Sequence, residues 1–113
     1  MKKIIHLIVV VAFCSCSAPK GLYTWNKYEK ASYNYLKKAD EKSAETIIVE
    51  YNNVINKQKG TRKTTPPGML ADYGFLLIQQ GQMEEGKLNL KREMALYPES
   101  KIFIDRILNL LEQ

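Results

Sequence analysis

The sequence is poor in the residue types from which catalytic and metal sites are built. It holds one histidine, His6, and two cysteines, Cys14 and Cys16, all within the first 16 of its 113 residues. It has no metal-ligand cluster and no glycine-rich phosphate loop, and no serine or threonine has a neighbouring base. Acidic pairs such as Asp40-Glu41 stand at expected turns and helix starts, where charge is solvated. We therefore predict that the protein is not an enzyme and holds no cofactor and no metal.

The sequence has no apolar run long enough to span a membrane, and its longest apolar run lies near the start of the chain. Two lysines, Lys2 and Lys3, precede the apolar run Ile4–Phe13, which ends at small residues. This pattern is typical of a secretory signal, and the run is shorter than the roughly 20 residues that span a bilayer. We predict a signal peptide at residues 1–15, a tether at residues 16–23 and a folded domain at residues 24–113.

The end of this signal resembles the lipobox of bacterial lipoproteins, in which a cysteine follows the cleavage site. Cys16 is preceded by the small residue Ser15, whereas Cys14 is preceded by the bulky Phe13. Phe13 also stands where the lipobox usually has leucine, three places before the cysteine. The resemblance implies acyl chains on Cys16, and several chains are needed for stable attachment. The alternative is an ordinary cleaved signal with an incidental cysteine.

The resemblance also implies a location. Ser17 follows the cysteine where aspartate would retain a lipoprotein in the inner membrane, so we expect the outer membrane, with the protein facing the periplasm. Cleavage would remove two lysines and leave a net charge of 15 − 12 = +3. That excess is too small for a nucleic-acid footprint, and we expect no nucleic-acid partner.

The remainder of the chain reads as five amphipathic helices, which predicts an all-α fold. Thr24 is the expected cap of the first helix, which we place from Trp25 to Ala39, and Ser100 is the expected cap of the last. The second helix, Lys42 to Lys57, has the cleanest apolar stripe. The third and fourth helices are expected at Pro67 to Gln80, before Gly81, and at Met83 to Tyr97, before Pro98.

A basic loop interrupts the helices between Lys59 and Pro66. Prolines 66 and 67 end any helix before them and can open the next. The cations of the loop and its start are Lys57, Lys59, Arg62 and Lys63. A solvated loop is the ordinary interpretation, and a contact site for an acidic partner or for lipid is the alternative.

The third and fourth helices together resemble one tetratricopeptide repeat, whose length is about 34 residues. Small residues at two positions of this repeat let its paired helices approach closely, and Gly74 and Gly86 occupy them here. Glu93 departs from the usual alanine, which predicts a neighbouring helix farther away or a wet edge. The matching residues are Leu70, Tyr73, Gly74, Leu77, Gly86, Leu90 and Pro98.

The first two helices fit the same repeat more loosely, with Ser32 and Ala44 at the small positions. The resemblance therefore implies two repeat-like helix–turn–helix units and a C-terminal capping helix. In such repeats the first helix of each pair lines a concave surface. The residues expected there form an apolar strip, with Glu29 beside it, which we call the concave strip: Tyr33, Leu36, Phe75 and Ile78.

Nearly the whole domain also resembles short bacterial lipoproteins of unknown function. They share an aromatic start like Leu22–Trp25, a Pro-Pro-Gly segment like residues 66–68, and an ending like Glu93–Pro98 plus a helix with Phe103. The resemblance implies partnership with other outer-membrane lipoproteins, among them a pore-forming protein of the curli-secretion kind. It implies no activity.

Three functions remain open from the sequence. The first is a lipid-anchored adaptor that binds another envelope protein through the concave strip, if that strip is exposed rather than buried. The second is a self-associating structural component of an outer-membrane assembly. The third is a binder of glycans or small molecules that uses its aromatic residues: Tyr23, Trp25, Tyr28 and Tyr33.

Overall fold

The computed structural model describes Met1, Ala18 and residues 20–113. The predicted lipidation site Cys16 and the predicted signal peptide, apart from Met1, therefore lie outside the described residues. None of the described helices is long and apolar enough to cross a membrane. The tether prediction is described only from Ala18 and from Lys20 onward.

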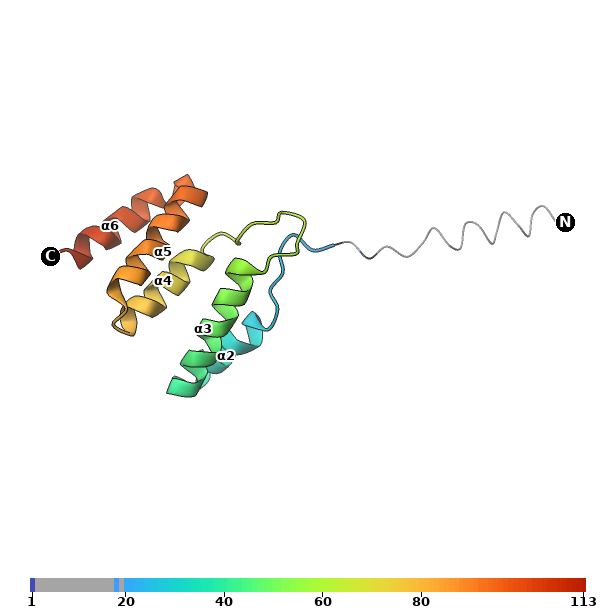
Figure 1. Cartoon of the computed structure of the whole chain (residues 1–113), viewed down its shortest axis with the longest axis horizontal. Helices are drawn as coiled ribbons and strands as arrows, with labels where there is room; N and C mark the ends of the chain where they lie inside the picture. The colour runs from blue at the N-terminus through green and yellow to red at the C-terminus, as the bar shows by residue number, and fades with distance from the viewer. Residues whose placement is uncertain (2–17, 19) are drawn as a thin grey trace.

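The described chain is all-α, as the sequence predicts (Figure 1). Its part from residue 20 onward contains no strand. Helices α2 and α3 form one pair, helices α4 and α5 form a second, and α6 lies at the end of the chain. The bounds are Tyr28–Lys38 for α2, Glu41–Asn56 for α3, Met69–Gln79 for α4, Met83–Leu96 for α5 and Lys101–Leu111 for α6, with a short 3-10 turn, η1, at Pro98–Ser100.

The first helix begins later than the sequence suggests, and its predicted cap is wrong. Thr24 does not cap α2, because its hydroxyl accepts a hydrogen bond from the backbone N–H of Lys59 at 3.0 Å. The backbone N–H and C=O of Thr24 both bond to the side chain of Gln58, each at 2.9 Å. Asn26 adopts a positive φ of 50°, which delays the helix until Tyr28. Thr24 therefore belongs to the connection with the loop after α3.

The predicted acidic pair Asp40-Glu41 forms the start of α3. Asp40 is the N-cap, and its Oδ1 accepts a hydrogen bond from the backbone N–H of Ser43 at 2.8 Å. The hydrogen bonds from the side chain and backbone of Ser43 hold the pKa of this carboxyl below its usual value. An acceptor at this position satisfies one of the N–H groups that a helix start leaves without a partner.

Glycines lie on both sides of helix α4. Gly68 precedes α4 with a φ of 84°, and Gly81 follows it with a φ of 83°. Glycine enters this left-handed region without the steric penalty of a side chain. The helix thus starts at Met69, two residues after the predicted Pro67, and stops where Gly81 predicted.

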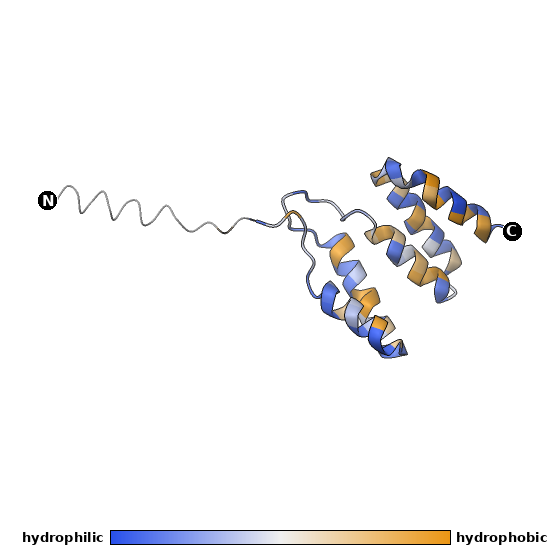
Figure 2. Cartoon of the chain, turned by 180° about the vertical axis from the view of Figure 1, so that it is seen from behind, coloured by the Kyte–Doolittle hydropathy of each residue, from blue (hydrophilic) through white to orange (hydrophobic). Residues whose placement is uncertain are grey.

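One buried cluster joins the two pairs. The rings of Tyr51 on α3 and Tyr73 on α4 stack with centroids 5.3 Å apart. Burial is the main cause that raises the pKa of the Tyr51 hydroxyl, and its hydrogen bond with Tyr28 contributes further. Helix α4 is apolar along most of its length (Figure 2) because it contacts both α3 and α5. The buried members are Ala31, Ile47, Tyr51, Val54, Ile55, Met69, Leu70, Tyr73, Leu76 and Leu77.

The predicted close contact between two glycines is confirmed. A Cβ atom on Gly86 would lie 2.6 Å from the carbonyl oxygen of Gly74, and one on Gly74 would lie 2.8 Å from the carbonyl oxygen of Gly86. Both distances are shorter than atoms tolerate, so the backbones of α4 and α5 meet at this point. The side chain of Ile78 fills the remaining space beside Gly86.

The C-terminal helix covers the second pair. Ile104 of α6 is fully buried with Ala71 and Leu90 in a second cluster. Ser100 stands at the N-cap of α6, and the helix begins at Lys101, as predicted. Its side chain makes no capping hydrogen bond, because the hydroxyl donates to the carbonyl oxygen of Tyr97 at 2.7 Å within the turn Pro98–Ser100.

We expect Gly86→Ala to lower the free energy of unfolding by about 1–2 kcal/mol, because overpacking costs more than the helix propensity of alanine returns. Urea denaturation measures the change. The matched control is Gly21→Ala, where a Cβ atom would lie 3.5 Å from the nearest oxygen. A Gly86→Ala variant as stable as the wild type would show that α4 and α5 do not meet closely.

Candidate functional site

The concave strip is divided by the structure. Tyr33 and Leu36 on α2 are exposed, at 62% and 78% of their surface, and Glu29 is exposed on the same helix. Phe75 and Ile78 on α4 are half-buried and pack against the cluster of Ala71, Leu90 and Ile104. The strip is therefore open on the first pair and largely occupied on the second.

A different apolar surface is exposed on α6. Ile102, Phe103 and Leu110 expose 72%, 61% and 67% of their surface. A helix turns through about 100° per residue, so Ile102 lies opposite the inward-facing Ile104, and Phe103 and Leu110 lie together on one flank beside Ile107. We call Ile102, Phe103 and Leu110 the outer face of α6. Apolar spacing alone does not reveal this surface, because apolar residues surround most of this helix and its inward side is not distinguished from the rest.

The basic loop is pinned against the segment that precedes α2. The backbone N–H of Thr61 donates to the carbonyl oxygen of Gly21 at 3.1 Å, and that of Arg62 donates to the carbonyl oxygen of Leu22 at 3.2 Å. Gly60 fits because a Cβ atom there would lie 2.2 Å from the Leu22 oxygen. The two segments lie side by side at one end of the domain (Figure 1).

These segments, residues 20–27 and 57–63, form what we call the tether edge. Lys59, Arg62 and Lys63, the predicted basic-loop residues, are all exposed there. Lys63 has a positive φ of 53°. The edge also exposes two large apolar side chains, Leu22 at 60% and Trp25 at 39%. The loop is thus a defined surface rather than a freely solvated connection.

Glu93 of α5 and Tyr97, just after this helix, hold the far end of the loop. Tyr97 donates its hydroxyl hydrogen to the carbonyl oxygen of Thr65 at 2.6 Å. Burial raises the pKa of Tyr97, its hydrogen bond with Tyr23 adds to the rise, and the nearby charge of Arg62 opposes it. These interactions connect Tyr23 before α2 and Arg62 in the loop to the second helix pair.

Glu93 is the second holding residue, and the prediction of a wet edge there is wrong. Its side chain is 2% exposed. Its Oε1 accepts a hydrogen bond from the backbone N–H of Gly68 at 2.6 Å, whereas its Oε2 is buried without a hydrogen-bond partner among the described residues. The carboxylate lies at the N-terminus of α4, where the helix dipole favours negative charge. Gly68 has no side chain to cap α4, so the start of this helix takes its acceptor from another part of the chain. The glycine at this position was therefore the sequence feature that could have indicated a capping role for a distant side chain.

The comparison with protein families places residues 22–107 in one family, described as Domain of unknown function (DUF4810). The chain belongs to this family. The DUF4810 region starts at Leu22 in the tether edge and includes helices α2 to α5 and most of α6. No curated protein and no solved structure matched the chain.

Within the DUF4810 domain the predicted aromatic binders mostly pack on one another. Ring centroids of Tyr23 and Trp25 are 6.1 Å apart, those of Trp25 and Tyr28 are 6.0 Å apart, and those of Tyr28 and Tyr51 are 5.3 Å apart. Tyr33 lies outside this series, with the Lys37 ammonium 5.8 Å from its ring centre. The series connects the tether edge to the core.

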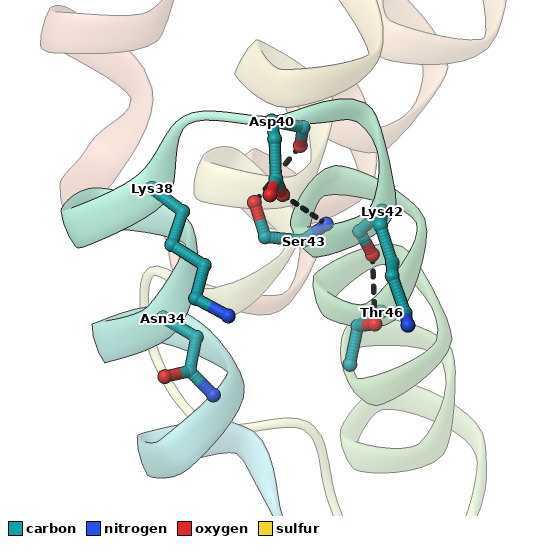
Figure 3. A pocket seen from close by; sticks show the side chains of 6 residues that line it. All are labelled: Asn34, Lys38, Asp40, Lys42, Ser43 and Thr46. Carbon is teal, nitrogen blue, oxygen red and sulfur yellow. Dashed lines mark hydrogen bonds between the residues drawn. The ribbon is translucent and has the colours of Figure 1, made fainter.

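Three hollows of the DUF4810 domain lie along α2 and α3 and the segments next to them, and polar or charged residues line them almost throughout. One, at the turn between these helices, measures about 170 Å³ and is lined by Asn34, Lys38, Asp40, Lys42, Ser43 and Thr46 (Figure 3). There the hydroxyl of Thr46 donates to the carbonyl oxygen of Lys42 at 2.8 Å. Within the described part of the chain, no group of three His, Cys, Asp or Glu residues could hold a metal ion.

Replacement of Glu93 should test whether its hydrogen bond with Gly68 stabilises the fold. We expect Glu93→Leu to lower the free energy of unfolding by about 1–3 kcal/mol, because it leaves the part-buried N–H of Gly68 without its acceptor. Glu93→Gln should lower it by only about 1 kcal/mol, because the amide oxygen can still accept. Urea denaturation of both variants measures this, and equal losses in the two would contradict the assigned role.

Proposed function

We propose that this DUF4810 protein is a lipid-anchored adaptor of the bacterial envelope, without catalytic activity. The sequence supports the anchor through the basic start, the apolar run and the Ser15-Cys16 pair, with acyl chains on Cys16. The residue after the cysteine, Ser17, supports the outer membrane, with the domain facing the periplasm. The partner is another envelope protein, and the resemblance favours a pore-forming lipoprotein of the curli-secretion kind.

The observation that carries the adaptor proposal is the outer face of α6. Terminal helices of repeat proteins usually present a polar outer side to water, but α6 exposes Ile102, Phe103 and Leu110. Exposed apolar groups that cluster on one helix face are typical of a protein-binding surface. We therefore assign the partner to this face rather than to Phe75 and Ile78, which are half-buried.

The position of α6 in the repeat pattern follows that of α4. The inward residues of α6 follow those of α4 at an interval of 104 − 70 = 34 residues, which is the length of about one repeat. Helix α6 thus corresponds in position to the first helix of a third repeat. The corresponding pairs are Leu70 and Ile104, Tyr73 and Ile107, and Leu77 and Leu111. We propose that an amphipathic helix of the partner packs on the outer face of α6.

Site-specific photo-cross-linking in intact cells tests this assignment. A photoreactive residue at position 103 should cross-link to a single envelope protein, because that position lies within the proposed contact. Position 45 on α3 is the control, since Glu45 is exposed and polar. With the cross-linker at 103, an additional Leu110→Asp change should reduce the product at least tenfold, whereas Cys16→Ala should abolish it because the anchor is lost.

The other outcomes discriminate among the alternatives. Cross-linking at position 36 but not at 103 would show that the partner binds the exposed half of the concave strip instead of α6. A product that contains two copies of this chain would indicate a self-associating structural component. The absence of any product at both positions would contradict the adaptor function.

A further inference from the structure

Positive charge is concentrated in two segments of the domain. Residues 17–28 and 51–71 contain no Asp or Glu and six cations: Lys20, Lys27, Lys57, Lys59, Arg62 and Lys63. The remaining residues after Cys16 carry 15 − 6 = 9 cations and all 12 acids, for a net charge of −3. All six cations are exposed. The modest net charge of the whole domain therefore hides a strongly basic tether edge.

The fold brings these cations together. The hydrogen bonds from Thr61 and Arg62 to Gly21 and Leu22 join the loop to the segment before α2. Lys27 and Lys57 line the same hollow of about 420 Å³, with Asn26, Glu50 and Asn53. The Glu50 carboxylate in that hollow is already used, because it accepts from the backbone N–H of Lys27 at 3.1 Å and the side chain of Asn53 at 3.4 Å.

Apolar and aromatic groups accompany the charge. Leu22 and Trp25 are exposed at this edge, and Trp25 packs edge-on against Tyr23. Lysine and arginine beside tryptophan, tyrosine and a protruding aliphatic side chain form the composition of surfaces that lie on lipid headgroups. A protein contact that needed only acidic complementarity would not require the exposed Leu22.

The chain length sets where this edge lies. From residue 16 to residue 22 the backbone spans at most roughly 20 Å. An acyl-anchored Cys16 would therefore keep the edge within a short distance of the headgroups. Electrostatic attraction acts over about 8 Å at physiological salt. Such a tether allows the six cations to come within this distance of the headgroups.

From this arrangement we propose that the tether edge binds the surface of an anionic membrane and orients the domain, with Trp25 and Leu22 at the headgroup level. This inference rests on the proposed lipid anchor. The bound orientation directs α6 away from the membrane, because α4 and α5 separate α6 from the tether edge (Figure 1).

Trp25 is the only tryptophan in the chain and reports on this contact directly. The full chain, purified from membranes, is reconstituted into vesicles of phosphatidylcholine with or without phosphatidylglycerol, and bromine-labelled lipids serve as quenchers. We expect a blue-shifted emission and strong quenching of Trp25 only with the anionic lipid, and both should decrease at high salt. Equal quenching in the two vesicle types, or none in either, would overturn the proposal.

Charge variants separate the edge from general attraction. The combined change Lys59→Gln, Arg62→Gln and Lys63→Gln should reduce quenching at least threefold, to the value in zwitterionic vesicles. The matched control removes the same charge from the other end with Lys91→Gln, Lys101→Gln and Arg106→Gln and should quench like the wild type. Circular dichroism shows whether both variants fold. The salt dependence of Trp25 quenching in the wild type tests the proposal without any substitution. Equal behaviour of the two triple variants would refute the assignment to this edge.

The lipid anchor is scored separately in the same preparation. The intact mass reports whether Cys16 carries acyl chains. If it carries none, the proposed anchor fails, and the chain is instead added to preformed vesicles for the same Trp25 measurement. Salt-sensitive quenching by anionic vesicles would then still support the tether edge, and its absence would overturn it.

Discussion

The hydrogen bond from the backbone N–H of Gly68 to the buried carboxylate of Glu93 is the contact on which the arrangement of this domain depends. It joins α5 to the start of α4, where glycine offers no cap of its own. A buried carboxylate is favourable here because it accepts from an N–H group at a positive helix end. One turn later, the hydroxyl of Tyr97 donates a hydrogen bond to the carbonyl oxygen of Thr65. Together they give the loop that follows α3 a defined position.

The sequence predicts the all-α fold and most helix bounds because apolar spacing and glycine stops are local signals. It also predicts the contact of Gly74 with Gly86, since two glycines inside helices need a packing reason. It fails at Thr24 and Glu93, whose partners are decided by tertiary contacts. Of the proposed concave strip, Tyr33 and Leu36 are exposed as a binding surface requires. The burial of Phe75 and Ile78 depends on α6, and periodicity alone does not reveal which of two apolar faces points inward.

Two surfaces with different chemistry follow from this construction. The tether edge is basic with an exposed tryptophan, and the outer face of α6 is apolar. In Figure 1, α4 and α5 separate α6 from the tether edge. Packing between α3 and α4, including the stacked Tyr51 and Tyr73, connects the pairs that carry them. A domain held by one end at a lipid surface would present the other end to a protein partner. This division explains how a small helical domain could act as an adaptor.

Hydrogen–deuterium exchange of the full chain, compared between anionic vesicles and detergent micelles, tests this division most directly. Exchange reports local opening and solvent access along the backbone. The account predicts slower exchange in vesicles at residues 20–27 and 57–63, with unchanged exchange in α6. Slower exchange in α6 together with no change at the tether edge would contradict it.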